Sequence, residues 1–123
     1  MTAPVALIDR YIAAWNATDA EDRRDLIAGA WTETAHYRDP LLSGDGHAGI
    51  DAMVQGLHGR FPGHRFKRTS DIDTHNDRVR FSWELAADGA DAIARGVDFG
   101  VVAPDGRLES ITGFFDFVAG QPG

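Results

Sequence analysis

Three segments in the first half of the chain carry apolar side chains at the three- and four-residue spacing of helices. Tyr11 and Trp15 share one stripe of the first segment, where Thr2 can act as a cap. The charged run 21–25 of the second segment is interpreted as a solvated face. Pro62 and Gly63 end the third segment. The predicted helices span residues 4–18, 20–30 and 49–61.

Strict alternation of apolar and polar side chains, the pattern of strands, dominates the second half. It is clearest from Val79 to Leu85, whose apolar face belongs either to the core or to an outer dimer surface. One short alternating segment lies earlier and stops at Pro40, which cannot donate to a ladder. Turn-forming residues separate the later segments, so we expect consecutive antiparallel hairpins. The predicted strands span residues 35–39, 66–73, 78–86, 92–102 and 108–118, with a loop at 44–46.

This order of elements predicts an α+β fold in a single domain, residues 1–123. Three helices that precede a long meander must bury their apolar stripes against one face of the sheet. A strongly twisted sheet wrapped around a helix forms a cone, and pockets are common at the open end of such a cone. Gly96, Gly100 and Gly113 lie within predicted strands, where they permit bends or leave room beside a ligand.

Composition narrows the classes of partner. A hydrophobic share of 43% in 123 residues is enough for one continuous core. The net charge of −7 disfavours nucleic acid, whose binding needs clustered Lys and Arg. The chain has no cysteine, which excludes disulfides, thiolate metal sites and a cysteine nucleophile.

The N-terminal segment MTAPVALIDRYIAAW has neither the basic start nor the cleavage site of a secretory signal. No run approaches the roughly 20 apolar residues that a membrane span needs. We therefore expect a cytoplasmic protein without a membrane partner.

Four segments together resemble the NTF2-like superfamily and, within it, the SnoaL-like group. They are RYIAAWNATD in the first helix, YRDP at the end of the first strand, the GxxGI pattern at the start of the third helix, and GVDFGVVAPDGRLESITGFF near the C-terminus. The resemblance covers essentially the whole chain. It implies a cone-shaped fold and a homodimer that pairs through the outer sheet face. Members include polyketide cyclases, ketosteroid isomerases, epoxide hydrolases, dehydratases and non-catalytic binding proteins, so the fold alone does not decide the function.

Three residues resemble the catalytic set of ketosteroid isomerase. Asp39, in YRDP, matches the aspartate that shuttles the proton. Asp98, in GVDFGVV, matches the protonated acid of the oxyanion hole, and Tyr11 on the first helix matches its tyrosine. Ile111 and Phe115 fall where that family lines its pocket with apolar groups.

Physical reasoning gives two interpretations of Asp39. Alternation places it on the same strand face as Tyr37, and apolar neighbours there would disfavour its ionised form and suit it to proton transfer. The alternative is that Asp39 caps the turn 40–46 through local hydrogen bonds.

Asp98 stands in the middle of a strand, where aspartate is depleted. Such a carboxyl must be paired, protonated or exposed. Its same-face neighbours Gly96 and Gly100 carry no side chain, which leaves space for a ligand atom. The alternative is an exposed edge position or a salt bridge with Arg95 or Arg80.

The aromatic residues of the predicted stripes have structural interpretations as well. Tyr11 suits a core position with its hydroxyl bonded to backbone. Trp15 suits the core or the pocket wall, and Tyr37 shares the predicted face of Asp39. We take Trp15, Tyr37, Ile111 and Phe115 as the candidate substrate contacts.

No metal and no cofactor are expected. The five histidines are scattered over strand, loop, helix and turn, without ligand spacing. Phosphate loops, dinucleotide fingerprints and G-x-S-x-G elbows are absent from the sequence. Epoxide opening by an activated water is disfavoured, because Arg95 and Asp98 point to opposite strand faces.

The leading hypothesis is a cofactor-independent isomerase or cyclase. Asp39 would move a proton next to a carbonyl of a small apolar substrate, and Tyr11 with Asp98 would stabilise the enolate oxygen. The alternative is a non-catalytic protein that binds an apolar metabolite in the same pocket. A third reading is a structural dimerisation domain whose cone is filled by side chains.

Overall fold

The computed structural model describes residues 4–120, so the predicted cap Thr2 lies outside the described residues. Three helices precede most of the sheet: α1 (Pro4–Asn16), α2 (Ala20–Ala30) and α3 (Gly46–Arg60). Helix α2 has the predicted bounds and begins at Asp19, whose side chain accepts a hydrogen bond from Asp22 N at 2.9 Å. Helix α3 begins at Gly46, earlier than the apolar stripe indicates. The three predicted helices are therefore present.

The strands form one mixed sheet in the order β2-β1-β7-β6-β5-β3, and β4 pairs with β5. All neighbours are antiparallel except β1 and β7, which run parallel. The strands are β1 (Trp31–Arg38), β2 (Ser43–Asp45), β3 (His64–Arg68), β4 (Asp73–His75), β5 (Arg78–Ala87), β6 (Ala94–Val102) and β7 (Leu108–Val118). The predicted α+β architecture of helices on a curved mixed sheet is confirmed.

Two segments depart from the prediction. The predicted loop 44–46 lies largely in β2, which pairs with β1, and the predicted strand 66–73 is divided into β3 and β4. The division has a local cause at Ser70, whose hydroxyl oxygen accepts the hydrogen bond of Ser82 N at 2.8 Å. A side chain takes the place of a backbone partner there, so the ladder to β5 is interrupted.

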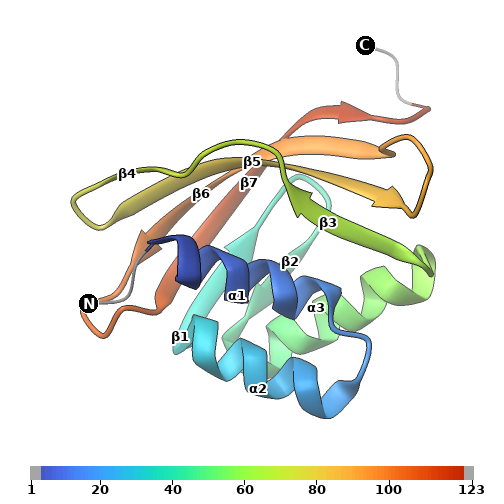
Figure 1. The fold of residues 1–123 in the computed structure, drawn as a ribbon. Helices are drawn as coiled ribbons and strands as arrows, with labels where there is room; N and C mark the ends of the chain where they lie inside the picture. Colours follow the sequence, from blue (N-terminus) through green and yellow to red (C-terminus); the bar gives the residue numbers. More distant parts are fainter. Residues whose placement is uncertain (1–3, 121–123) are drawn as a thin grey trace.

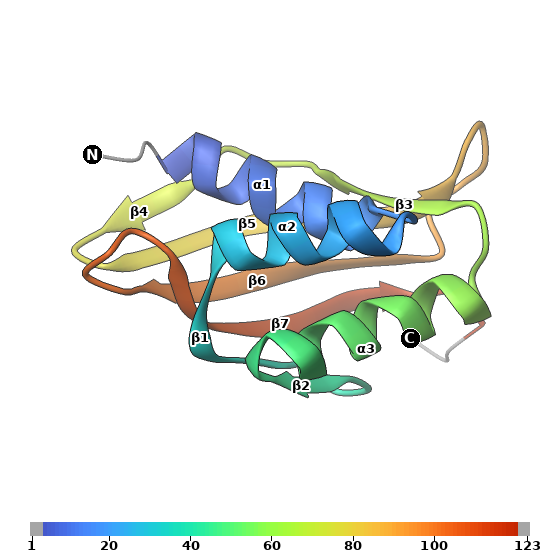
Figure 2. The same ribbon diagram turned by 90° about the horizontal axis from the view of Figure 1, so that it is seen from below.

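All three helices lie on one side of the curved sheet (Figure 1). In the view from below, α1 lies on the β3 side of the sheet and α3 runs along its β1–β2 side (Figure 2), in keeping with the contacts of α1 with β3 and of α3 with β1 and β2. The inward face of β5 is buried, which places the alternating stripe Val79 to Leu85 in the core rather than on an outer surface. The largest fully buried side chains are Trp31, Tyr11, Phe81, Ile8, Ile27, Ile50, Leu108, Ile111 and Val54.

The charged run 21–25 is not wholly a solvated face. Arg23 is only 4% exposed, and its Nε donates to Asp51 Oδ1 at 2.6 Å, which joins α2 to α3. Its Nη1 also donates to the carbonyl oxygen of Ala17 at 3.2 Å. Of the described helices, none is long and apolar enough to cross a membrane.

Candidate functional site

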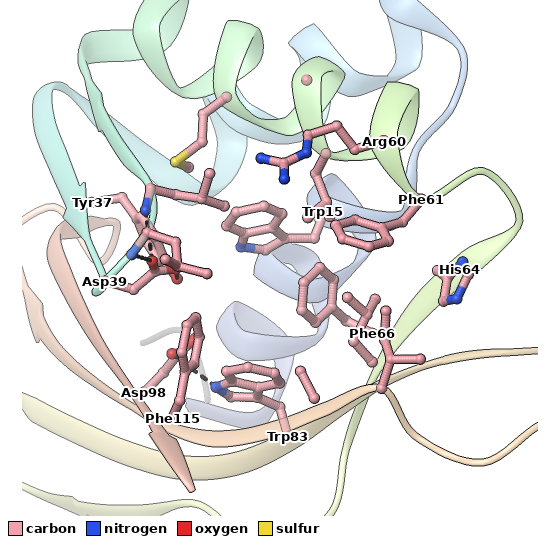
Figure 3. Close-up of a pocket in the computed structure, with 18 of the residues that line it drawn as sticks. Trp15, Tyr37, Asp39, Arg60, Phe61, His64, Phe66, Trp83, Asp98 and Phe115 are labelled. Carbon is pink, nitrogen blue, oxygen red and sulfur yellow. Dashed lines mark hydrogen bonds between the residues drawn. The ribbon is translucent and has the colours of Figure 1, made fainter. Parts of the chain in front are cut away.

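A cavity of about 730 Å³ lies inside the cone, lined by residues of α1, α3 and the sheet. Its existence contradicts the reading of a cone filled by side chains. Most of its wall is apolar, and Figure 3 shows the aromatic side chains that surround it. The acidic residues at the cavity are Asp39 and Asp98, and Tyr11 and Tyr37 lie beside them.

The aromatic wall is a series of rings in contact. Trp15 packs at 5.3 Å from Tyr37 and at 5.0 Å from Phe66 between ring centroids. Trp83 continues the series at 5.5 Å from Phe66 and 5.9 Å from Phe115. Asn16, at the end of α1, exchanges two hydrogen bonds with the Phe66 backbone, at 2.8 and 2.9 Å, which fix β3 against α1. Aromatic contacts of this kind stabilise the packing of the wall.

Asp98 is buried on β6 and is held by two donors. The Tyr11 hydroxyl donates to its Oδ2 at 2.6 Å, and Trp83 Nε1 donates to its Oδ1 at 3.0 Å. Asp98 is 4% exposed and pairs with neither Arg80 nor Arg95, so neither the exposed position nor the salt bridge holds. The structure therefore shows Asp98 as a buried carboxyl group held by hydrogen bonds.

Burial raises the pKa of Asp98 from 3.8 to about 7. The hydrogen bonds from Tyr11 and Trp83 lower this pKa in part, and the charge of Asp39 raises it. A carboxyl group with this pKa has both protonation states accessible near neutral pH, which suits it to donate or accept a proton.

Asp39 directly follows β1, and its contacts bear out the second interpretation made from sequence, a cap of the following turn. Its Oδ1 accepts hydrogen bonds from the backbone nitrogens of Leu41 and Leu42, at 2.8 and 2.7 Å, so it caps the turn. Its Oδ2 accepts from the Tyr37 hydroxyl at 2.6 Å, and Asp39 also lines the cavity. A carboxylate offers about four acceptor positions, so these three bonds leave one on Oδ2.

Tyr11 and Tyr37, the tyrosines bonded to the two carboxyl groups, remain neutral hydrogen-bond donors. Burial, then the charge of Asp98, raises the pKa of Tyr11 well above its ordinary value. Burial raises the pKa of Tyr37 as well, with further contributions from Asp98 and Asp39. Each phenol therefore keeps its proton at neutral pH and can donate to an oxygen.

The two carboxyl–tyrosine pairs meet at Gly113 on β7. A Cβ placed on Gly113 would lie 3.0 Å from Asp98 Oδ1, 3.1 Å from the Tyr37 hydroxyl oxygen and 3.2 Å from Asp39 Cβ. Gly113 pairs directly with Asp98 in the β6–β7 ladder. The missing side chain thus makes the room in which the polar groups converge. We call Tyr11, Tyr37, Asp39 and Asp98 the polar end of the cavity.

The other two glycines do not leave space for a ligand, contrary to the expectation. A Cβ on Gly96 would meet the Trp83 ring at 2.6 Å, and one on Gly100 would meet Ile111 Cδ1 at 2.7 Å. The Phe114 carbonyl oxygen and the Trp83 ring fill the position beside Gly96, and Ile111 fills the position beside Gly100. These glycines serve close packing of the strands.

Three of the four predicted substrate contacts, Trp15, Tyr37 and Phe115, line the cavity. Ile111 does not: it is fully buried, at 0% exposed, beneath the sheet face at Gly100. Sequence reasoning missed Trp83 as the second donor to Asp98. The signal that could have identified Trp83 is the apolar alternation from Val79 to Leu85 in β5, since assigning this stripe to the core turns Trp83 inward.

Sequence reasoning also missed the cavity residues of α3 and of the segment after it, which are Ala52, Met53, Gly56, Leu57, Arg60, Phe61 and His64. Within residues 4–120, no group of three or more histidine, aspartate or glutamate side chains is placed to hold a metal ion. His47 and His58 instead lie at the carbonyl oxygens of Trp31 and Trp15, at 2.8 and 2.7 Å.

The curved mixed sheet, the helices on its concave side and the enclosed cavity define an NTF2-like α+β cone. The SnoaL-like domain family matches residues 8–111, and the chain belongs to this family. A comparison with curated protein sequences found no match.

Solved structures agree with this assignment. A SnoaL-like family protein from Agrobacterium tumefaciens str. C58, named a "putative isomerase", is 40% identical with a TM-score of 0.88, over 94% of this chain and 99% of that one. A SnoaL-like protein from Jannaschia sp. CCS1, named a "putative" polyketide cyclase, is 17% identical with a TM-score of 0.71, over 99% of both chains. An NTF2-like protein from Exiguobacterium sp. 255-15 is 16% identical with a TM-score of 0.72, over 89% of this chain and 98% of that one. The last two share the fold.

Proposed function

We propose that this protein is a cofactor-independent enzyme that moves a proton next to a carbonyl group of a small apolar substrate, as an isomerase or a cyclase. The observation that carries the proposal is the convergence of Asp39 and Asp98, each bonded by a tyrosine, on a largely apolar cavity. The name of the relative from A. tumefaciens supports the same class of reaction.

In the proposed reaction, Asp39 accepts the proton from the carbon beside the carbonyl through the free acceptor position of Oδ2. The electron pair of the C–H bond forms the enolate, whose oxygen accepts hydrogen bonds from protonated Asp98 and from the Tyr11 hydroxyl, which turns from Asp98 Oδ2 to the substrate. Asp39 then returns the proton to another carbon of the substrate. In the cyclase, the enolate carbon instead attacks a second carbonyl, whose π electrons move to its oxygen, and Asp39 gives its proton to that oxygen. Acid–base catalysis contributes about 10² to 10⁴ in rate, and each oxyanion donor about 10² to 10³.

The protonation state of Asp98 gives this reaction a pH dependence. Asp98 must keep its proton to donate to the enolate oxygen, and its pKa is about 7. We expect turnover to fall as the pH rises through that value.

A β,γ-unsaturated bicyclic ketone tests the proposal, because its conversion to the conjugated ketone is followed by ultraviolet absorbance. We expect Asp39→Asn to lower kcat by at least a hundredfold, with substrate binding retained. Turnover within about threefold of the wild type would show that Asp39 is not the base.

One observation favours a second function, the sequestration of an apolar metabolite without catalysis. Every carboxyl and phenol group of the polar end already has a partner inside the protein. A site of this kind binds an apolar ligand without losing polar contacts. Ligand retained without chemical change, and an affinity that responds to Asp98→Ala, would identify this function.

We also propose a homodimer through the outer sheet face. Phe99, Phe114 and Phe117 lie exposed on β6 and β7, and Phe114 is 58% exposed. Exposed aromatic groups on adjacent strands are typical of an interaction surface. Analytical ultracentrifugation should show a dimer for the wild type and a shift toward monomer for Phe114→Ser.

A further inference from the structure

We infer that the substrate is an amphipathic anion, an apolar body that carries a carboxylate at the end bound by Arg60. This inference rests on the proposed use of the cavity for a small apolar molecule, and it names the chemical class of that molecule. The supporting observation is the distribution of charge around the cavity: Arg60 lies on one side of the wall, and the acidic residue Asp39 lies on the other.

Arg60 is the cation of the wall. It is the last residue of α3, and it is the sole arginine or lysine among the described residues that line the cavity. In Figure 3 its guanidinium points over Trp15 into the cavity, across from Asp39 and Asp98. The Phe61 ring lies between Arg60 and His64, at 5.8 Å from the guanidinium carbon and 5.8 Å from the imidazole centroid.

Arg60 is one of six arginines that form no ion pair within residues 4–120, and of these six it alone lines the cavity. Arg23, Arg38, Arg80 and Arg107 each form an ion pair within residues 4–120, whereas Arg60 takes part in none of the ion pairs there. A guanidinium presents five donors in a planar fork that matches a carboxylate. Arg60 is exposed to solvent and also lines the cavity, so this fork lies at the cavity rim where a carboxylate can reach it.

Helix geometry gives a simpler reason for a cation at this position. A positive charge in the last turn of a helix interacts favourably with the helix dipole. That interaction accounts for an arginine at position 60 but not for a side chain aimed into the cavity. It also predicts an effect on stability and none on the choice between ligands.

The two ends of the cavity orient a ligand together. The carboxylate of Asp39 disfavours a second carboxylate beside it, and Arg60 attracts one. A ligand with both a carbonyl and a carboxylate is therefore held with its carbonyl at the polar end. In this orientation the carbon beside the carbonyl lies next to Asp39. The apolar wall needs no hydrogen bond to the ligand to hold it there.

A matched pair of fluorescent probes, pyrene-1-butanoate and its primary amide, tests the inference. We expect the wild type to bind the carboxylate about tenfold more tightly than the amide, and Arg60→Gln to abolish the preference by weakening the carboxylate alone. Arg65→Gln is the control, since Arg65 lies on adjacent β3, is exposed and does not line this cavity, yet its replacement changes the net charge equally.

Three outcomes overturn the inference: no carboxylate preference in the wild type, including failure of both probes to bind; a preference retained within twofold in Arg60→Gln; and an equal loss in Arg65→Gln. The same ratio measured in Asp39→Asn separates the two proposals. A preference that persists in Asp39→Asn, while turnover of the ketone stays within about threefold of the wild type, would reject the proposed chemistry and keep the anion site.

Discussion

The Tyr11 hydroxyl of the first helix donates a 2.6 Å hydrogen bond to Asp98 of the sixth strand. This bond opposes the effect of burial, because it lowers a pKa that desolvation raises. The protonation of Asp98 therefore depends on how α1 sits against the sheet. A shift of the helix would change the acidity of the site without touching the carboxyl group itself.

Replacing Tyr11 by phenylalanine should raise the pKa of Asp98 above about 7, since a donor to the carboxylate is lost. The loss of a buried bond to a charged group should also lower the free energy of unfolding by about 1–3 kcal/mol. Carboxyl ¹³C NMR titration measures the pKa directly. Tyr37→Phe is the control, because Tyr37 donates to Asp39 instead. An Asp98 pKa that stays constant or falls in Tyr11→Phe would contradict this prediction.

Asp98 should make the protein less stable as the pH rises from about 4 to about 7. Its pKa is raised in the folded state, from 3.8 to about 7, so the native state binds more protons than the unfolded state in this window. The contribution of Asp98 is complete below pH 4 and is lost through pH 7, with a slope that approaches about 1.4 kcal/mol per pH unit.

Urea unfolding of the wild type and of Asp98→Asn at several pH values between 4.5 and 7.5 isolates this contribution. Groups such as Glu33 and Asp105, whose pKa values are lowered by Arg107, act equally in both proteins. The difference in unfolding free energy between the two should move in favour of the variant as the pH rises. A difference independent of pH would refute the assignment.

Gly113→Ala should damage the polar end, because the new methyl group would lie about 3 Å from Asp98, Tyr37 and Asp39 at once. We expect a loss of about 1–3 kcal/mol in unfolding free energy and a shifted Asp98 pKa. Gly59→Ala is the control: nothing lies within 4 Å of its added carbon, and alanine favours the helix by up to about 1 kcal/mol. Equal stability of Gly113→Ala and the wild type would show that the groups can move aside.

Arg23→Ala should lower the free energy of unfolding by about 1–3 kcal/mol, since it removes the charge-assisted hydrogen bond to partly exposed Asp51. Arg24→Ala, at the exposed next position, should change it by less than about 0.5 kcal/mol. Thermal or urea denaturation of the two variants decides the matter. Similar small losses of unfolding free energy in Arg23→Ala and Arg24→Ala would mean that the Arg23–Asp51 pair contributes no more than a surface salt bridge.

Much of the fold follows from sequence because periodicity reports which face of each element is buried. The bounds of α2 and β7 agree with the prediction, and Asp39, Asp98 and Tyr11 all reach one cavity. Strand register does not follow from periodicity. The Trp83–Asp98 bond depends on it, since Trp83 pairs with Gly96 and Phe81 with Asp98 across the β5–β6 ladder.

Other features depend on contacts that no local pattern encodes. Arg23 belongs to a run that looks solvated, and only the packing of α2 on α3 buries it. Ile111 and Phe115 both point inward from β7, yet the curvature of the sheet leaves Phe115 at the cavity and closes Ile111 beneath it. Arg60 reaches the cavity only because α3 ends at its rim.

The parallel pairing of β1 with β7 joins Tyr37 to Ile111, segments far apart along the chain. Contacts of such large sequence separation form slowly, because closing the intervening loop costs entropy before any pairing repays it. We expect Asp39 to reach Gly113 only when this last ladder closes. A newly synthesised chain would thus hold its helices and hairpins before it could bind any ligand, and ligand binding would report the final step of folding.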